Sequence, residues 1–499
     1  ITGNNEKLLR YWFEINSTLT DFQAKDFNSV ELSKAYWFPY NKGGKFRKWY
    51  GNHDYVINWK TKGVDFTRGK NSFSKYFFKE YFSWTYLSSS TLATRYYPDG
   101  FLWDVHGSGA FPYKQEDIFY LLGLISSKVG LALLSIINPT ISFQVENIVA
   151  LPVIKPDNEI LKNQIIESIH KCINISKEDW DNFETSWNFK TFPLLRYSGQ
   201  FDIAEAIEYF KQIWATKFKE LHSQEELINE RYLEVYGLTQ ELDSKIPIKD
   251  ITILDDISKI NHGGLEIENK KLIENYISYA VGCMFGRYSL DKKGLIVASE
   301  GETFHKFLNK IDKTIKECSY LPDVDNIIPV LEDDWFEDDI VGKFNQFLRV
   351  TFGEKYFNKN LTFIEEQIGK DIRNYFLRDF YPDHIKRYKK RPIYWMFSSP
   401  KGSFNVLIYM HRYTPDTVSN ILNKYLKEFI GKLNTRKEHI DRVKETGTAS
   451  EKSKAIKESD NIQKILVELH EYERDILYPL ATERIEIDLD DGVLVNYNK

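Results

Sequence analysis

"FDIAEAIEYFKQIWATKFKELHSQEELINERYLEVY", residues 201–236, sets the organisation of the chain. Its apolar residues recur at helical spacing over about ten turns, and no Pro or Gly interrupts them, so the pattern predicts one or two long helices. Gly237 follows directly and is expected to end the helical run. Aromatic runs typical of strands lie before this stretch, and mainly helical patterns lie after it.

The part before the long helix is predicted to be β-rich. Residues 30–110 consist of short runs of Tyr, Phe, Trp and Thr cut by Gly, Asn, Asp and Pro, which indicates a curled antiparallel sheet. We expect a helix over 116–137, an extended run over 138–156 and an amphipathic helix over 158–176. Together these elements predict a β-rich domain over 1–178, closed by helices.

Two further regions complete the predicted organisation. Residues 179–340 read as a helical spacer that ends in an acidic, turn-rich loop at 321–340. Residues 341–499 read as a mixed carboxy-terminal domain with a β-hairpin over 391–413 and a largely polar helical arm over 416–478. The predicted fold class is therefore α+β, a mixed fold.

Cysteine usage bears on the cellular compartment. The three cysteines, Cys172, Cys283 and Cys318, are far apart and form no CxxC pair, which disfavours a zinc site and a disulfide framework and favours a reducing cytoplasm. The first residue is Ile1 and no signal-peptide pattern follows it, so we expect a piece of a longer protein.

One stretch, "IFYLLGLISSKVGLALLSII" at 118–137, is long and apolar enough to cross a bilayer. Ser126, Ser127 and Lys128 lie at its centre, where a cation is costly. We therefore predict a buried helix with one polar stripe and no membrane contact.

Charge is unevenly distributed. The net charge of −5 disfavours a protein that coats nucleic acid indiscriminately. Residues 41–80, however, hold ten Lys and Arg against three acids, a local balance of +7, whereas residues 321–340 hold eight acids and no base. The chain thus has a basic and an acidic pole.

Several phrases are more specific than composition: "TGNNEKLLRYWFE", "WFPYNKGGKFRKWYGN", "SYAVGCMFGRYSLD", "RPIYWMFSSPKGSF", "IYMHRY" and "DLDDGVLVN". In this order they resemble the carboxy-terminal half of the PglX (BrxX) family, the adenine-specific DNA methyltransferases of the bacterial BREX phage-defence systems. The resemblance implies that a catalytic domain precedes a target-recognition domain and helical spacers, and that the parent protein marks self DNA.

The catalytic motifs of such an enzyme are not found in this chain. Adenine N6 methyltransferases typically carry an Asn/Asp-Pro-Pro-Tyr/Phe tetrad that binds the flipped base. The nearest text, Asn138-Pro139-Thr140-Ile141, has no second proline and no ring, and is explained as a turn. Neither Gly43-Gly44 nor Gly263-Gly264 has the context of a methyl-donor loop. We expect no catalytic or cofactor-binding residue here, and S-adenosylmethionine to be held upstream of Ile1.

The loop "NKGGKFRKWYGN" at 41–52 offers the chemistry of DNA recognition. Its glycines let the backbone approach a phosphate, its lysines can neutralise phosphates, and its Arg and Asn side chains fit base edges. Two interpretations of Trp49 and Tyr50 stay open, stacking on an exposed base or bracing the turn as core residues. A solvated rim remains the plain alternative for the whole loop.

Two more basic segments extend the candidate surface, residues 61–77 and "KRYKKR" at 386–391, each of which also fits an ordinary solvated surface. The candidate DNA-binding residues are Asn41, Lys42, Gly43, Gly44, Lys45, Arg47, Lys48, Trp49, Asn52, Lys60, Lys62, Arg68, Lys70, Lys75, Lys389 and Arg391.

A metal centre is not predicted. The acids between Glu332 and Asp339 are consecutive in a probable loop without a nearby Lys, which fits a solvated or partner-docking face better than a Mg²⁺ nuclease. His53, His106 and His411 show no ligand spacing.

The expected partners are double-stranded DNA, other BREX-system proteins and a phage protein that mimics DNA. The alternative hypothesis makes the chain an assembly module for defence-system partners with little DNA contact of its own.

Overall fold

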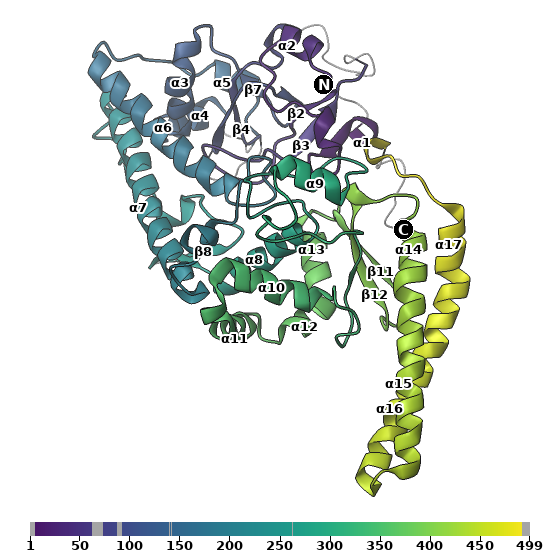
Figure 1. Cartoon of the computed structure of the whole chain (residues 1–499). Helices are drawn as coiled ribbons and strands as arrows, with labels where there is room; N and C mark the ends of the chain where they lie inside the picture. The colour runs from purple at the N-terminus through teal and green to yellow at the C-terminus, as the bar shows by residue number, and fades with distance from the viewer. Residues whose placement is uncertain are drawn as a thin grey trace. The chain divides into compact units, whose positions relative to one another are not determined.

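The computed structural model describes residues 5–61, 73–86, 92–138, 140, 142–261 and 263–491 (Figure 1). The chain forms two compact units. Unit 1 comprises Ile1–Pro193 and Glu205–Leu272, and unit 2 comprises Leu194–Ala204 and Ile273–Lys499.

Unit 1 contains small sheets, as the aromatic runs predict. One is four-stranded, in the order β1 (Leu9–Tyr11), β3 (Tyr55–Asn58), β2 (Trp37–Asn41) and β6 (Leu102–Trp103). Another is three-stranded, in the order β5 (Thr94–Tyr97), β4 (Tyr81–Trp84) and β7 (Gly109–Ala110). The pairings are antiparallel except for β2 with β6, so the single antiparallel sheet expected over 30–110 is replaced by two sheets with one parallel pair. A hairpin of β8 (Ser258–Asn261) and β9 (Gly264–Ile267) completes the strands.

Buried rings hold the first sheet together. Phe38, Tyr40, Ile57 and Phe78 are fully buried in one cluster, and Trp59 packs edge-on to Phe78 at 5.6 Å between ring centroids. Short helices α1 (Asn5–Leu8) and α2 (Phe27–Leu32) accompany it, and the side chain of Asp26 caps α2 by accepting from the Ser29 N–H. The many aromatics of the sequence thus form the core of the β-rich part.

The prediction of a single helix over 116–137 is wrong in one respect. The segment forms two helices, α3 (Ile118–Ser126) and α4 (Lys128–Ile137), with a bend of 73° between them. Ser127 is extended, and its hydroxyl accepts from the Gly130 N–H at 3.1 Å, so it caps α4. Among the described residues no single helix is both long and apolar enough to cross a bilayer, and this bent pair passes that test only when its halves are taken together.

The next elements follow the predicted order, with one correction. The run expected to be extended over 138–156 contains a short helix, α5 (Val145–Val149), which Gln144 and Asn147 cap reciprocally. The amphipathic helix is confirmed as α6 (Glu159–Asp181), and the opening stretch as one helix, α7 (Ile203–Tyr236). Gly237 ends α7 with a left-handed φ of 67°.

Unit 2 combines helices with a small sheet. Its helices before the arm are α8 (Asn269–Met284, which starts in unit 1), α9 (Phe304–Ile311), α10 (Ile340–Phe352), α11 (Phe357–Ile368), α12 (Ile372–Tyr375) and α13 (Tyr381–Arg387). The hairpin predicted over 391–413 is confirmed as β11 (Tyr394–Ser398) and β12 (Asn405–Tyr409). The acidic segment 321–340 is not only a loop, because β10 (Ile328–Pro329) within it pairs with β12.

The polar stretch near the end is helical, as predicted for the arm over 416–478, and it folds back on itself as a helical hairpin. After α14 (Thr417–Asn420), α15 (Lys427–Thr446) and α16 (Ala449–Tyr472) lie side by side in Figure 1, and α17 (Tyr478–Glu483) follows. Thr448 and Glu451 form a capping box at the turn. The α+β class expected from the sequence is confirmed.

Candidate nucleic-acid interface

The glycine-containing loop leaves β2 at Asn41 and enters β3 at Tyr55. Gly43 and Gly44 have positive φ values of 78° and 147°, and a Cβ on Gly44 would lie 2.8 Å from the Asn52 side chain. Asn41 is buried: its Oδ1 accepts from the Gly43 N–H at 2.9 Å, and its Nδ2 donates to the Gly107 carbonyl at 3.0 Å. Asn41 therefore shapes the loop and ties it to the segment after β6.

Arg47, a predicted base-reading residue, is turned into unit 1. Its Nη1 lies 2.8 Å from Oδ2 of Asp179 on α6, with the two side chains 6% and 0% exposed. Its Nη2 lies 3.7 Å from Asp255, and its guanidinium sits 5.2 Å from the Trp180 ring centroid. Burial alone would lower the pKa of Arg47, but the nearby carboxylates outweigh it and raise the pKa. Burial raises the pKa of Asp179 to about 6.

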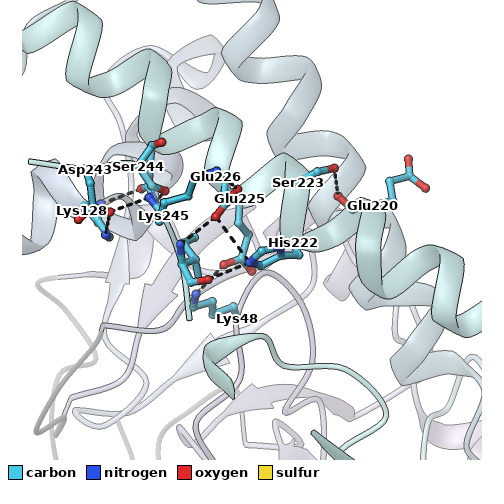
Figure 2. A network of polar contacts seen from close by, with 12 residues as sticks. Lys48, Lys128, Glu220, His222, Ser223, Glu225, Glu226, Asp243, Ser244 and Lys245 are labelled. Atoms are coloured by element: carbon cyan, nitrogen blue, oxygen red, sulfur yellow. Dashed lines mark hydrogen bonds and ion pairs between the residues drawn. The ribbon is translucent and has the colours of Figure 1, made fainter. Parts of the chain in front are cut away.

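Lys48 and Trp49 converge on Glu225 of α7. Figure 2 shows Lys48 reaching this carboxylate, with Nζ 2.6 Å from Oε2, while the Trp49 indole donates to Oε1 at 2.7 Å. Both side chains are buried, and Trp49 has a left-handed φ of 69°. Trp49 thus occupies the bracing position that the sequence left open, and a buried carboxylate holds both residues.

Asn52 and Tyr50 also belong to the interior of the loop. The Asn52 amide donates to the Lys45 carbonyl at 2.9 Å, which closes the loop across its neck. Tyr50 is buried, with the Lys177 ammonium 5.8 Å from its ring centroid. Residues 47–52 therefore act as an anchor, and residues 42–46 form the tip.

The tip carries the exposed side chains. Lys45 pairs with Asp256 at 3.3 Å, but the two side chains are 81% and 59% exposed, so the pair is weak and easily exchanged. Lys42 is half-buried, with its ammonium 5.0 Å from the centroid of Tyr55. Both cations remain within reach of solvent.

The remaining predicted residues are distributed over both units. Lys60 and Lys75 are exposed in unit 1 and lie over the rings of Tyr36 and Tyr76. Lys389 is exposed and Arg391 half-exposed in unit 2. Lys62, Arg68 and Lys70 lie outside the described residues.

Exposed aromatic rings occur on the tip and on two neighbouring segments, and they were not predicted as contacts. The segment 104–114 joins the start of the loop, next to the tip, through the Asn41 to Gly107 hydrogen bond. Residues 73–79 join that segment through Tyr76, which stacks on Phe111 at 4.8 Å. We call the exposed Lys, Phe and Tyr residues of these segments, together with half-buried Lys42, the loop face: Lys42, Lys45, Phe46, Phe73, Lys75, Lys79, Tyr113 and Lys114. The signal was present as Lys next to aromatics in "GKF", "FSK" and "YK".

Asn138 and Thr140 of the tetrad-like text are held by local hydrogen bonds. Asn138 ends α4, its Nδ2 donates to the Ser142 carbonyl at 2.6 Å, and its Oδ1 accepts from the Thr140 N–H at 3.1 Å. Pro139 and Ile141 lie outside the described residues. The Asn138 amide is therefore engaged by its own neighbours.

Several acids of segment 321–340 are engaged in hydrogen bonds or ion pairs, and two of the three histidines considered above are buried. The Tyr425 hydroxyl lies 3.0 Å from Asp325 and 2.8 Å from Asp338, and Arg373 pairs with Asp339 at 3.0 Å. His53 is buried among rings and His411 is buried, whereas His106 is exposed. Within the part of the chain that the structure describes, no group of three His, Cys, Asp or Glu residues could hold a metal ion.

The similarity of this chain to known proteins extends over its whole length. No family model matches it. It is 34% identical over 524 residues to the adenine-specific methyltransferase PglX of Lacticaseibacillus casei (strain Zhang) and 33% identical over 519 residues to the adenine-specific methyltransferase BrxX of Escherichia coli O9:H4 (strain HS). These matches cover 100% of the chain but 41% and 42% of the two proteins. The chain is therefore a relative of the PglX and BrxX adenine-specific methyltransferases, matched along its whole length to about two fifths of theirs.

Proposed function

We propose that the chain is the DNA-recognition and carboxy-terminal part of an adenine-specific DNA methyltransferase of a BREX phage-resistance system. The observation that carries this proposal is the match to PglX and BrxX over the full chain. In this proposal the chain holds duplex DNA, and a catalytic domain elsewhere in the protein binds S-adenosylmethionine, receives the extruded adenine and methylates its N6.

The loop face supplies the proposed contact. Its lysines, Lys42, Lys45, Lys75, Lys79 and Lys114, would neutralise phosphates and release their counterions. Its exposed rings, Phe46 at 37%, Phe73 at 53% and the fully exposed Tyr113, offer stacking surfaces to unpaired bases. Asn41, Arg47, Lys48, Trp49 and Asn52, which the sequence suggested as contacts, would serve as the scaffold that aims the tip.

The anchor lowers the entropy cost of the proposed DNA contact, because it holds the loop in place before DNA binds. Residues 47–52 are held by buried carboxylates and by backbone pairing, such as the Trp49 N–H to the Thr94 carbonyl at 2.7 Å. A loop already fixed in place loses little conformational entropy when DNA binds. Lys389 and Arg391 of unit 2 would add contacts to the DNA backbone.

A second candidate function is assembly with defence-system partners. Glu332, Asp333 and Asp334 are exposed and form an acidic surface of unit 2 that DNA would repel and a basic protein would attract. In the DNA-binding proposal, a phage protein with a DNA-like acidic surface would compete with DNA for the loop face.

The salt dependence of DNA binding separates these functions. The chain is titrated with duplex DNA at several salt concentrations, alongside the triple variant Lys42→Ala, Lys45→Ala and Lys75→Ala. If each lysine contacts one phosphate, the negative slope of log K against log salt should become less steep by about 2.7, at about 0.9 per contact.

The matched control removes three exposed lysines from α16: Lys454→Ala, Lys457→Ala and Lys464→Ala. It loses the same charge but should keep the wild-type slope. Binding without salt dependence, no binding, or equal slopes for both triple variants would favour assembly over DNA recognition.

A further inference from the structure

Exposed aliphatic side chains gather in unit 1 between the end of α4 and the start of α6. Six of them are between 46% and 80% exposed, and we call them the apolar patch: Ile136, Val145, Val149, Val153, Ile154 and Ile160. Figure 1 shows α4 and α5 next to each other, and Asn138 after α4 bonds to Asn147 of α5 at 3.2 Å. Exposed apolar side chains that lie close together are more typical of binding sites than single scattered ones.

The backbone beneath the apolar patch is fixed by tyrosines. The Tyr236 hydroxyl donates to the Pro152 carbonyl at 2.7 Å and accepts from the Ile154 N–H at 3.1 Å. The Tyr120 hydroxyl donates to the Ile154 carbonyl at 2.6 Å. These bonds satisfy the backbone polar groups, while the Val153 and Ile154 side chains face solvent, so a partner would meet a surface that is already ordered.

We infer that the apolar patch packs against the polypeptide that PglX and BrxX carry outside the region matched here. This inference rests on the proposed function, because one protein that recognises a site and methylates it must join its parts. More than half of each relative's length lies outside the match, and the fully buried centre of a protein interface is richer in apolar surface than its rim. A membrane is a poorer occupant, since exposed Glu146, Asp157 and Glu159 lie among the patch residues.

Cysteine labelling tests the inference. Ile136→Cys and Val149→Cys, 80% and 78% exposed, are compared with the control Leu32→Cys, 88% exposed in α2 of the same unit. Cys172 and Cys283 are buried, and the half-buried Cys318 is replaced by Ser throughout. The rate of maleimide labelling is measured in the 499-residue chain and in the full-length protein that contains it.

In the full-length protein, labelling at 136 and 149 should slow by about tenfold or more, because a covered thiol reacts only while the interface is open. Labelling at 32 should change by less than about twofold. Equal rates in both proteins would overturn the inference. So would protection of the 499-residue chain alone that rises with its concentration, which indicates a second copy, or protection that appears only with anionic lipid vesicles.

The labelling uses no DNA, so its outcome is independent of the salt titration. Patch protection with no DNA binding would leave the interface standing and remove the proposed DNA contact. Salt-dependent DNA binding with equal labelling rates would do the reverse.

Discussion

Replacing Arg47 by Ala should cost unit 1 about 3–5 kcal/mol of unfolding free energy, the usual cost of removing one partner of a buried ion pair. The guanidinium lies 2.8 Å from the Asp179 carboxylate, and neither side chain is more than 6% exposed. Without Arg47, the Asp179 carboxylate stays buried beside the Leu254 N–H at 3.1 Å and the like charge of Asp255. The lost charge partner therefore outweighs the lost packing.

Urea denaturation followed by tryptophan fluorescence measures this cost, since Trp180 lies against Arg47. Lys45→Ala is the control: it removes a cation two residues away whose partner is exposed, and should cost less than about 1 kcal/mol. Adding Asp179→Asn to Arg47→Ala should recover part of the loss, because the uncompensated charge is removed. If Arg47→Ala were no more costly than Lys45→Ala, yet changed the preferred DNA sequence, Arg47 would face DNA and the anchor would be refuted.

Three further predictions concern parts of the scaffold. Burial lowers the pKa of His53 from 6.5 to about 3, so its stabilising contribution is complete above pH 6.5 and is lost by up to about 1.4 kcal/mol per unit as pH falls towards 3. Burial raises the pKa of Asp179 from 3.8 to about 6, so this group makes the unfolding free energy rise as pH falls between those values, opposite to His53. The His53 contribution is therefore measured as the difference between wild type and His53→Phe. The unfolding free energy of His53→Phe should gain relative to wild type only below pH 6.5. The Glu468 carboxylate accepts hydrogen bonds from the Ser399 hydroxyl, the Lys401 N–H and the Ser403 hydroxyl at 2.5–2.7 Å. Glu468→Ala should therefore lower the unfolding free energy measured in urea by about 3 kcal/mol or more. A loss no larger than that of the exposed control Glu471→Ala would contradict this. A Cβ at Gly130 would lie 2.1 Å from the Leu124 carbonyl, so Gly130→Ala should lower the melting temperature by several degrees, whereas Gly431→Ala, with open space around it in α15, should gain about 0.5–1 kcal/mol.

Elements governed by local pattern were predictable. The helix α7 follows from an unbroken apolar period without Pro or Gly, and the β11–β12 hairpin from two aromatic runs around Pro400 to Gly402. The bend at Ser127 was not predictable, because the sequence is apolar on both sides. There Asn229, 101 residues away, accepts from the Lys128 N–H at 2.9 Å and stabilises the start of α4.

The sequence draws attention to the loop at 41–52 but does not reveal how its side chains are oriented. Basic and aromatic residues identify the loop, yet nothing nearby reveals which cations are buried. Arg47 and Lys48 meet acids 132 and 177 residues away in the sequence, on α6 and α7. Only the tertiary structure brings these carboxylates under the loop, where Arg47 and Lys48, two predicted DNA ligands, lie buried in ion pairs.

This arrangement separates what holds the loop from what the loop presents. The anchor residues 47–49 are buried and paired, whereas Lys45 contributes its carbonyl to Asn52 and directs its side chain to solvent. A backbone contact survives any change of side chain, so substitutions at 45 and 46 can alter charge or stacking without loosening the loop. Substitutions at 47 or 48 instead leave a buried carboxylate without its cationic partner. DNA affinity should therefore respond to residues 42–46, and stability to Asn41 and to residues 47–52 on either side of them.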